Sequence, residues 1–379
     1  MGKVTKLKSG KISTKDIISQ LNKRAGVNIA YDLQEENPTD VKDWIPTGSR
    51  WLDCIIAKGK LAGIPVGKVT EIAGLEATGK SFMAAQIAAN AQKKGFRVAY
   101  FDSESAIDSN FLQRSGCDLD ELVYIQATSV ESVLAQIEDL LKIPEKWLFI
   151  WDSLALTPSE HDIESDYNPQ SSMAMKARIL SKGMPKLVQP IANAGASLLV
   201  LNQLKTNITR SPAEAMTTPY MTPGGKTLPY SYSLRIWLTG RKAKASFVLD
   251  DNGFRIGSEV KCKIEKSRFG STGRTCNFKI LWDVTDHVGI QDRESWFDAI
   301  QISENLEQSG AWYALVHEDG TKEKFQRAHW LSKLEDDRFK NRVLQLMDDD
   351  VIKKFSDRTG NASDFYESDE SESPDSTEE

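Results

Sequence analysis

The chain has 379 residues, of which 40% are hydrophobic and 27% are charged, and its formal net charge is −6. This composition is ordinary for a soluble globular protein, and the length suits one large domain or two smaller ones. No apolar run approaches the ~18–20 residues of a membrane-spanning helix, and the first residues lack the apolar stretch of a signal peptide.

The charge is distributed unevenly along the chain. Residues 361–379 hold eight acidic residues and no basic one, so the rest of the chain carries +2. The first 15 residues hold five lysines and no acidic residue. An average of −6 argues against a nucleic-acid ligand, but a nearly neutral body between a basic arm and an acidic tail leaves that function open.

The cysteines and histidines do not form a metal-binding pattern. Four cysteines are scattered without a C-x-x-C pair, and the four histidines show no ligand spacing. In a chain of this size we expect reduced thiols in a cytosolic setting and no protein-built zinc site.

The first two thirds of the chain alternate between apolar strands and helices. A short amphipathic helix is expected at about 14–25. Strands are expected at 69–74, 97–102, 147–152 and 196–203, and helices after residue 80, at 129–142 and at 176–195. Pro185 and Pro190 must kink or divide the last helix. Because a continuous apolar strand such as WLFIWD (147–152) is typical of a parallel sheet, we predict an α/β domain with a mostly parallel sheet flanked by helices.

The pattern changes after Gln203. Residues 204–227 are polar and show no period, and a loop of that length is usually functional or disordered. Strands dominate from Tyr230 to Trp282, with a hairpin turn at Asp250–Gly253. The aromatic residues between 292 and 354 are sufficient for a separate small core, and the chain beyond Ser356 is expected to be disordered.

One segment matches the phosphate-binding pattern G-x-x-x-x-G-K-[ST] in full. It comprises Gly74, Leu75, Glu76, Ala77, Thr78, Gly79, Lys80 and Ser81. The glycines let backbone N–H groups surround a phosphate, Lys80 would reach the β- and γ-phosphates, and the Ser81 hydroxyl would bind Mg²⁺. ATP with Mg²⁺ is therefore the expected cofactor.

Two acidic residues could complete the chemistry of this loop. Asp152 ends the apolar strand WLFIWD, where a carboxylate would join the Mg²⁺ shell through water. Glu104 follows the strand VAYFD, where it could polarise water toward the γ-phosphate. On residue type alone, Glu104 equally suits a solvated surface, and Asp152 could instead cap a helix.

Several segments then resemble RecA-type recombinases, including the UvsX type found in phages. The matching segments are 45–81, VAYFDSESAID (98–108), FIWDSLALTP (149–158), LLVLNQLKTNI (198–208), 222–236, KIEKSR (263–268) and ENLEQSGAWYAL (304–315). The resemblance covers about 45–315. It implies an N-terminal arm at 1–44, a RecA-type ATPase core at 45–290, a small α+β domain at 291–358 and an acidic tail at 359–379.

The resemblance also implies roles for individual residues of the ATP site. Glu104 would activate water, and Asp108 and Phe111 would lie at the adenine. Gln203 would sense the γ-phosphate. Lys266 and Arg268 would cross a subunit interface to the ATP of the next protomer; read without the resemblance, KIEKSR is a basic strand on a solvated face.

Two DNA-binding loops are implied in the same way. The first spans about 159–177 and departs from the family by its acidic residues and by Pro169; its end supplies Met173 and Arg178. The second spans about 204–227. Its residues carried over from the family are Lys205, Ile208, Arg210, Gly224, Gly225 and Lys226.

The chain thus resembles an ATP-dependent recombinase of the cytoplasm, or of a host cytoplasm if encoded by a phage. It would form a helical filament on single-stranded DNA, pair it with double-stranded DNA, and act in recombination and repair. A single-strand-binding protein and a loading mediator are expected partners, and the N-terminal helix would pack on the neighbouring protomer. Alternatives are a recombination mediator, a hexameric helicase, or a DNA-binding scaffold in which ATP is a structural ligand.

Overall fold

A computed structural model describes residues 12–26, 28–35, 37, 39–105, 107–164, 169–207, 219–225, 227–240, 246–284 and 288–355, with side chains described from residue 174 in the helix that begins at 169. The chain divides into two units, Met1–Lys42 and Asp43–Glu379. Within the described ranges, no helix is long and apolar enough to cross a membrane.

The first unit contains the helix α1 (Thr14–Ala25), as the amphipathic pattern predicts. The Ser13 side chain accepts a hydrogen bond from the Asp16 N–H, and Gly26 ends the helix with a φ of 72°. Asn22 then holds the following backbone, because its Oδ1 accepts from the N–H groups of Ile29 and Ala30 at 2.9 Å. No residue of α1 is buried.

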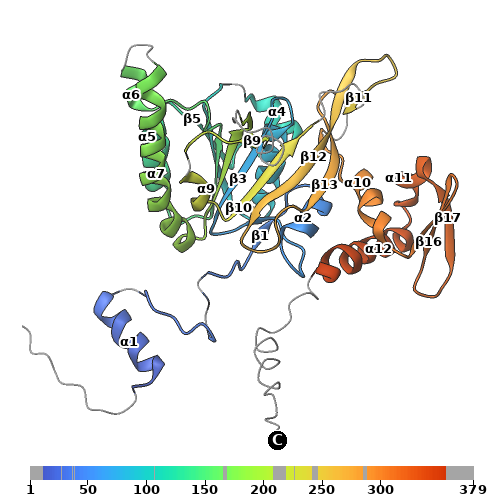
Figure 1. The fold of residues 1–379 in the computed structure, drawn as a ribbon, viewed down its shortest axis with the longest axis horizontal. Helices are drawn as coiled ribbons and strands as arrows, with labels where there is room; N and C mark the ends of the chain where they lie inside the picture. Colours follow the sequence, from blue (N-terminus) through green and yellow to red (C-terminus); the bar gives the residue numbers. More distant parts are fainter. Residues whose placement is uncertain are drawn as a thin grey trace, which may run out of the picture. The chain divides into compact units, whose positions relative to one another are not determined.

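The second unit is built on a sheet of ten strands (Figure 1). Six of them are parallel: β10 (Leu234–Thr239), β3 (Val69–Gly74), β7 (Ser197–Gln203), β6 (Trp147–Asp152), β4 (Arg97–Asp102) and β5 (Leu122–Gln126), in that spatial order. An antiparallel part continues from β10 through β12 (Arg255–Ser267), β13 (Thr275–Leu281) and β14 (Gly289–Ile290), with β11 (Phe247–Leu249) beside β12. A two-stranded sheet, β1 (Trp44–Ile45) with β2 (Ile64–Pro65), precedes it. The predicted α/β class with a mostly parallel sheet is confirmed.

Helices cover both faces of the parallel sheet because its strands are apolar on both. Alternate residues of β6 point to opposite faces: Leu148 and Ile150 pack with α3 (Lys80–Lys93), whereas Phe149 and Trp151 pack with α5 (Val130–Leu140) and α7 (Pro169–Asn193). The shorter helices are α2 (Arg50–Ile56), α4 (Ser109–Arg114), α6 (Glu160–Glu164) and α9 (Leu228–Ser231).

The helix α7 runs without a break through Pro185 and Pro190, so of the two predicted effects, a kink or a division, division does not occur. Each proline inside a helix costs about 3 kcal/mol. Burial opposes that cost, at about 1.5–3 kcal/mol for each large apolar side chain. Four such side chains of α7 are fully buried against the sheet and α5, namely Leu180, Met184, Leu187 and Ile191.

The segment 159–177, predicted as the first DNA-binding loop, is largely helical because it contains α6 and the start of α7. The backbone N–H of Ser159 donates to Asp162 Oδ2 at 2.8 Å, and the Asp162 N–H donates to Ser159 Oγ at 3.3 Å. This reciprocal pair is a capping box. Of the acidic residues that set this segment apart in sequence, Glu160 and Asp162 lie in the first turn of a helix, where negative charge is stabilised.

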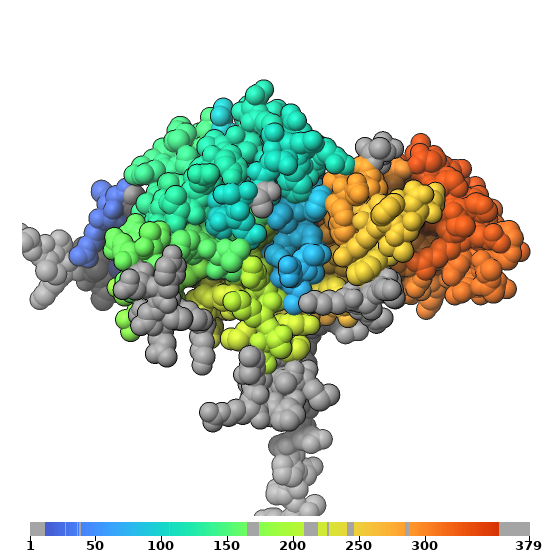
Figure 2. All heavy atoms as spheres, turned by 90° about the horizontal axis from the view of Figure 1, so that it is seen from above, coloured from blue at the N-terminus to red at the C-terminus, as the bar shows by residue number. Residues whose placement is uncertain are grey.

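The hairpin predicted at Asp250–Gly253 is confirmed, and it joins β11 to β12. The Gly253 N–H donates to the Asp250 carbonyl at 3.0 Å, and Gly253 has a φ of 84°. The hairpin projects beside the C-terminal segment, which both views show at one end of this unit (Figures 1 and 2).

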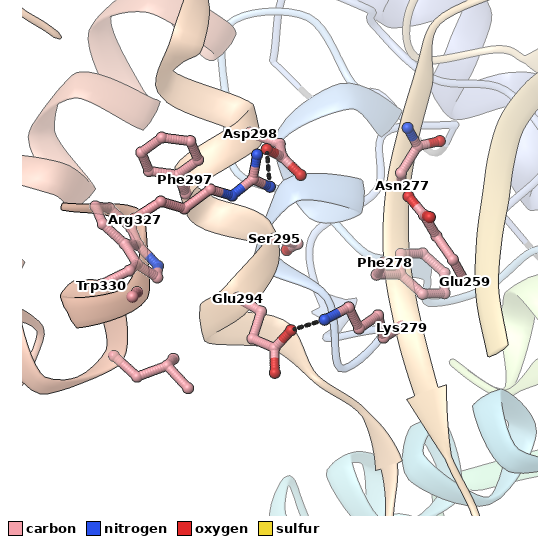
Figure 3. Close-up of a pocket in the computed structure, with 12 residues that line it drawn as sticks. Glu259, Asn277, Phe278, Lys279, Glu294, Ser295, Phe297, Asp298, Arg327 and Trp330 are labelled. Carbon is pink, nitrogen blue, oxygen red and sulfur yellow. Dashed lines mark hydrogen bonds and ion pairs between the residues drawn. The ribbon is translucent and has the colours of Figure 1, made fainter. Parts of the chain in front are cut away.

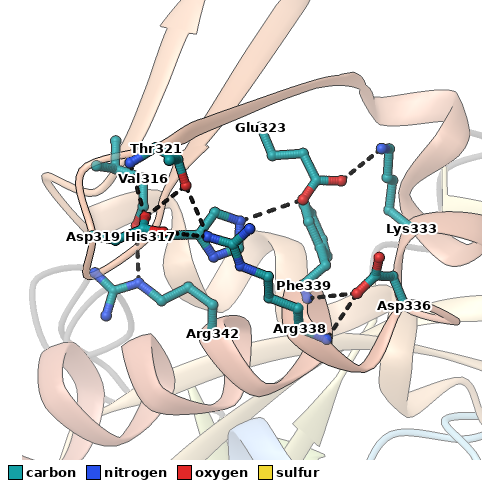
Figure 4. Close-up of polar contacts among 10 residues, drawn as sticks. All are labelled: Val316, His317, Asp319, Thr321, Glu323, Lys333, Asp336, Arg338, Phe339 and Arg342. Carbon is teal, nitrogen blue, oxygen red and sulfur yellow. Dashed lines mark hydrogen bonds and ion pairs between the residues drawn. The ribbon is translucent and has the colours of Figure 1, made fainter.

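The C-terminal segment has its own three-stranded sheet and aromatic core. Its elements are α10 (Asp292–Ala299), β15 (Leu306–Ser309), β16 (Trp312–Val316), β17 (Lys322–Gln326), α11 (Trp330–Lys333), α12 (Asp337–Leu346), a π-helix (Met347–Ile352), and 3₁₀ turns at Ile300–Ile302, Arg327–His329 and Lys353–Phe355. Polar contacts join the β16–β17 hairpin to the last helices (Figure 4). Among them, Lys333 pairs with Glu323 at 2.6 Å and Arg338 with Asp319 at 2.7 Å.

Phe325 lies at the centre of this aromatic core, within 6.3 Å (between ring centroids) of Phe297, Tyr313, Trp330 and Phe339. Because its side chain is 2% exposed, Phe325→Ala should destabilise the segment by about 3–5 kcal/mol. Amide hydrogen exchange of peptides from 306–346 measures this loss. The control Ile302→Ala, at a side chain that is 65% exposed, should leave exchange nearly unchanged. Equal exchange in the two variants would show that Phe325 does not hold this core together.

Candidate nucleotide-binding and catalytic site

The loop 74–79 joins the end of β3 to the start of α3, and its two glycines have no room for a side chain. A Cβ on Gly74 would lie 2.5 Å from Thr78 Oγ1 and 3.1 Å from the Leu238 carbonyl oxygen. Gly79 has a φ of 79°, and a Cβ there would lie 2.5 Å from Ile280 Cδ1. Both glycines are thus required by backbone conformation and close packing.

Lys80 begins α3 and its ammonium lies over the loop. Its Nζ donates to the carbonyl oxygens of Leu75 at 3.1 Å and Gly74 at 3.4 Å. Burial lowers the pKa of Lys80, while the nearby carboxylates of Asp152 and Glu104 oppose that shift. An ammonium group whose hydrogen bonds in the cleft go to backbone carbonyl oxygens is suited to an anionic ligand.

Ser81 and Asp152 are in direct contact in the cleft. Ser81 Oγ donates to Asp152 Oδ2 at 2.8 Å, and the Tyr100 hydroxyl donates to the same oxygen at 2.8 Å. Burial raises the pKa of Asp152, and these two hydrogen bonds oppose the shift. A hydroxyl beside a carboxylate fits Mg²⁺, which takes one or two protein oxygens together with phosphates and waters. Within the described ranges, no group of three or more His, Cys, Asp or Glu could hold a metal ion.

Glu104 lies just beyond β4, beside Asp152. Its Oε1 accepts a hydrogen bond from Ser153 Oγ at 3.1 Å, and its backbone N–H donates to Asp102 Oδ1 at 2.8 Å. Ser103 Oγ also accepts from the Ser153 N–H at 2.9 Å, so the ends of β4 and β6 are joined. The carboxylate is therefore held in place while remaining exposed to the cleft.

Gln203 ends β7 on the same edge of the sheet, in register with Gly74 of the neighbouring strand β3. Together with the loop, Lys80, Ser81, Glu104 and Asp152, it lines one cleft of about 690 Å³. The carboxyl ends of adjacent parallel strands meet at one edge of a sheet. Residues that follow or end these strands, although far apart in sequence, therefore converge there.

The comparisons with known proteins agree with this arrangement. The model of the RecA N-terminal domain family matches residues 12–286. Protein RecA of Wolbachia pipientis subsp. Culex pipiens is 31% identical over 78% of this chain and 79% of its own length. Protein RecA of Fusobacterium nucleatum is 28% identical over 82% of this chain and 78% of its own length, and that of Bifidobacterium breve is 29% identical over 78% and 71%.

The chain belongs to the RecA family. At this level the predicted resemblance to RecA-type recombinases is confirmed.

Two residues predicted to lie at the adenine do not line the cleft of this RecA-family protein. Asp108 caps α4, because its Oδ1 accepts from the Phe111 N–H at 2.6 Å. Phe111 packs edge-on against Phe82, with ring centroids 4.8 Å apart, and Phe82 itself lines the cleft. The structure therefore connects Phe111 to the cleft through one intervening ring.

Lys266 and Arg268 lie at the end of β12, away from the cleft of their own chain. Lys266 Nζ donates to the Pro229 carbonyl oxygen at 2.8 Å, and Arg268 Nη2 to that of Tyr230 at 3.2 Å. Burial lowers the pKa of Lys266, and the positive charges of Arg268 and Arg235 lower it further. Neither residue is among those that line the nucleotide cleft, so their predicted role requires a second protomer.

The structure brings part of the two predicted DNA segments together. Arg178 of α7 and Gly225 line one largely apolar hollow of about 580 Å³. A Cβ on Gly225 would lie 3.1 Å from Ala177 Cβ, and one on Gly224 would lie 2.4 Å from Leu228 Cδ2. Both glycines have positive φ, of 89° and 111°. The positive φ values therefore favour glycine at both positions, and close packing against α7 and α9 adds to that preference.

The other predicted DNA residues are only partly covered by the structure. Lys205 is exposed in β8 (Lys205–Thr206), which pairs with β9 (Tyr220–Met221), so the ends of the second loop form a small ribbon that the aperiodic sequence did not predict. Ile208, Arg210, Lys226 and the side chain of Met173 lie outside the described part of the chain.

The sequence missed several residues that shape these sites. Tyr100 donates a hydrogen bond to Asp152, and Ser153 donates one to Glu104. In the sequence, the only signal for these two residues was their position in or directly after a strand that leads to the cleft. Lys176 donates to the Ala155 carbonyl oxygen at 2.9 Å and so joins α7 to the turn after β6. Burial lowers its pKa to about 8, while Asp162 opposes the shift and Lys205 adds to it.

A separate hollow of about 320 Å³ lies between β13 and the C-terminal segment (Figure 3). Its cations are already paired, Lys279 with Glu294 at 2.7 Å and Arg327 with Asp298 at 2.8 Å. Glu259 adds a further carboxylate to the lining. With its positive charge compensated, this hollow does not have the character of a phosphate site.

Proposed function

We propose that this RecA-family chain is an ATP-dependent recombinase that polymerises on single-stranded DNA and catalyses homologous pairing and strand exchange. The observation that carries the proposal is the convergence of the phosphate loop, Lys80, Glu104, Asp152 and Gln203 in one cleft. Gln203 is separated by one residue from β8, where the second DNA segment begins. The proposed ATP site and the proposed DNA segment would therefore be adjacent in the chain, at the end of β7 and the start of β8.

The residues of the cleft divide the chemistry of ATP hydrolysis among them. Backbone N–H groups of the loop and Lys80 would bind the phosphates, leaving the carbonyl contacts that Lys80 now makes. Ser81 and Asp152 would hold Mg²⁺, which neutralises phosphate charge when bound. Glu104, held by Ser153, would orient water and accept its proton. Asp108 and Phe111 would lie on the adenine side.

Lys266 and Arg268 would act on the ATP of a neighbouring protomer. Their position outside their own cleft supports this role, since both now donate to backbone carbonyl groups. Cations supplied across an interface offset the charge of the transition state, as arginine fingers do. Hydrolysis would then depend on assembly of the helical filament.

DNA contact would come from the two segments beside α7. Lys205, Arg178, Arg210 and Lys226 are cations suited to phosphates, which position a strand without reading its sequence. Gly224 and Gly225 would allow backbone N–H groups to approach the strand, with Met173 and Ile208 against the bases. Contacts that ignore base identity suit an enzyme that works on any homologous DNA.

The proposed arm, core and C-terminal domain would have different roles in the filament. The apolar residues Ile17 and Leu21 of α1 are 47% and 44% exposed, which supports packing of the arm 1–44 on the neighbouring protomer. The core would span 45–290 and the C-terminal domain 291–358. A cytoplasmic location, a single-strand-binding protein and a loading mediator as partners, and a phage origin stay predictions.

The acidic tail lies outside the described residues. We expect it to compete with duplex DNA for the DNA-binding surface of the protein. Deleting the residues after Thr359 removes the eight acidic residues of 361–379 and their repulsion of phosphate. We expect duplex affinity to rise and its Mg²⁺ requirement to fall, measured by fluorescence anisotropy at low salt. Unchanged duplex binding would instead make the tail a solubility or partner-docking segment.

The proposal is tested by measuring ATP hydrolysis with and without single-stranded DNA and imaging the same sample by electron microscopy. We expect DNA-stimulated hydrolysis and helical filaments. Closed rings with duplex-unwinding activity would replace the proposal with the helicase alternative.

A further inference from the structure

Glu71 is a fully buried carboxylate at the centre of the sheet that carries the phosphate loop. It lies in β3, three residues before Gly74, and is 0% exposed. Its Oε2 accepts from Arg235 Nε at 2.6 Å, and its Oε1 accepts from Asn202 Nδ2 at 2.9 Å. One side chain thus joins three adjacent strands, because Arg235 belongs to β10 and Asn202 to β7.

Arg235 extends the contact to the end of the second DNA segment. Its Nη2 donates to Thr222 Oγ1 at 3.0 Å, directly before Pro223 and the two glycines. The guanidinium also lies over the rings of Tyr232 and Trp237, at 6.0 and 5.7 Å from the ring centroids. With its side chain 11% exposed, Arg235 has little freedom to move independently of the sheet.

Asn202 connects the same carboxylate to the residue next to it, Gln203. Its Nδ2 also donates to the Pro223 carbonyl oxygen at 3.2 Å, and its Oδ1 accepts from the Gln203 N–H at 2.9 Å. The next residue, Leu204, donates its N–H to the Gly74 carbonyl oxygen at 3.0 Å. We call Thr222 and Pro223, near the end of the second DNA segment, its stem. The nucleotide cleft and this stem are therefore linked by consecutive hydrogen bonds.

Stability alone does not account for this choice of residues. Burial raises the pKa of Glu71, although Arg235 and Asn202 oppose the shift, so the carboxylate has a net desolvation cost. A buried ion pair commonly contributes no more than well-packed apolar residues of similar volume. What the polar set adds is a fixed geometry, in which every hydrogen bond has a direction.

We propose that Glu71, Arg235 and Asn202 are positioning residues that couple the nucleotide cleft to the stem of the second DNA segment at Thr222 and Pro223. A shift at Gly74 or Gln203 is transmitted through these hydrogen bonds, and a shift of the stem is transmitted back. By reciprocity, nucleotide then raises DNA affinity by the same factor by which DNA raises nucleotide affinity. This inference rests on the proposed function, because it concerns how its two sites communicate.

The test is the coupling factor, defined as the dissociation constant for a fluorescent oligo-dT without nucleotide divided by that with a non-hydrolysable ATP analogue. The variant E71M/R235M replaces the ion pair with apolar residues of similar volume, so that neither charge is left unpaired. We expect its coupling factor to fall at least tenfold. Its affinity for the analogue without DNA should stay within about threefold of wild type.

A matched control removes another ion pair, in the hollow of Figure 3. The variant K279M/E294M should keep the wild-type coupling factor. A second variant, Thr222→Val, removes one hydroxyl at the stem and keeps the shape of the side chain. Its coupling factor should fall by about threefold, a loss of roughly 0.7 kcal/mol as expected for one hydrogen bond.

The outcomes separate this inference from the proposed function. If the wild-type chain binds DNA equally well with and without nucleotide, so that its coupling factor is one, the proposed function itself is contradicted. A wild-type coupling factor in folded E71M/R235M would overturn the inference alone. If that double variant does not fold, Thr222→Val decides, and an unchanged factor there overturns the inference.

Discussion

Glu104→Gln is expected to abolish DNA-stimulated ATP turnover while ATP and DNA binding persist. Glutamine keeps an oxygen that can accept from Ser153 Oγ, so the geometry of the site is retained. It cannot accept a proton from water, and the loss of a general base typically costs about 10²–10⁴-fold in rate. Steady-state hydrolysis with saturating single-stranded DNA measures the loss, and anisotropy confirms DNA binding.

The control for this substitution is Glu145→Gln. Glu145 precedes β6, at the opposite end of that strand from Asp152, and its side chain is about half exposed. We expect wild-type turnover from this variant. If Glu104→Gln hydrolyses ATP at a comparable rate, Glu104 is not the catalytic glutamate.

Lys266 and Arg268 are expected to act on the ATP of a neighbouring protomer, so their removal should strongly reduce ATP turnover. The double variant K266A/R268A should lose about 10³-fold or more of its turnover, the magnitude typical of cations supplied in trans. A Lys80→Met variant should be inactive because its own loop is defective. Mixed in equal amounts, the two should recover about a quarter of wild-type activity, since one interface in four combines an intact loop with intact cations.

A second mixture controls for this recovery. Lys80→Met and Glu104→Gln both damage the cleft of their own protomer, so no interface in their mixture has an intact loop and an intact glutamate. That mixture should stay inactive at every ratio. Failure of the first mixture to recover at any ratio would contradict a trans role for Lys266 and Arg268.

The sequence predicted the architecture of the core because its cues are local. The strand WLFIWD is apolar on both faces, and the turn Asp250–Gly253 has the residues that a hairpin requires. The phosphate loop was also readable, since its glycines, lysine and serine form one pattern within eight consecutive residues. Residues after successive parallel strands converge at one edge, which placed Glu104, Asp152 and Gln203 together.

Contacts between distant strands could not be predicted in this way. Glu71 and Arg235 are 164 residues apart, and each looks like an ordinary charged residue in its own strand. Tyr100 meets Asp152 only because β4 and β6 are adjacent in the sheet. The helix α7 runs through Pro185 and Pro190 because packing outweighs a local preference. In each case the deciding interaction is tertiary.

Homologous pairing driven by ATP is the activity that the proposed function requires of this chain. A strand-exchange assay tests it most directly, with circular single-stranded DNA coated by the protein and a labelled linear duplex. We expect ATP-dependent transfer of the labelled strand from a homologous duplex and none from a heterologous one. Equal yields from both duplexes, or no transfer by a preparation that hydrolyses ATP on single-stranded DNA, would contradict it.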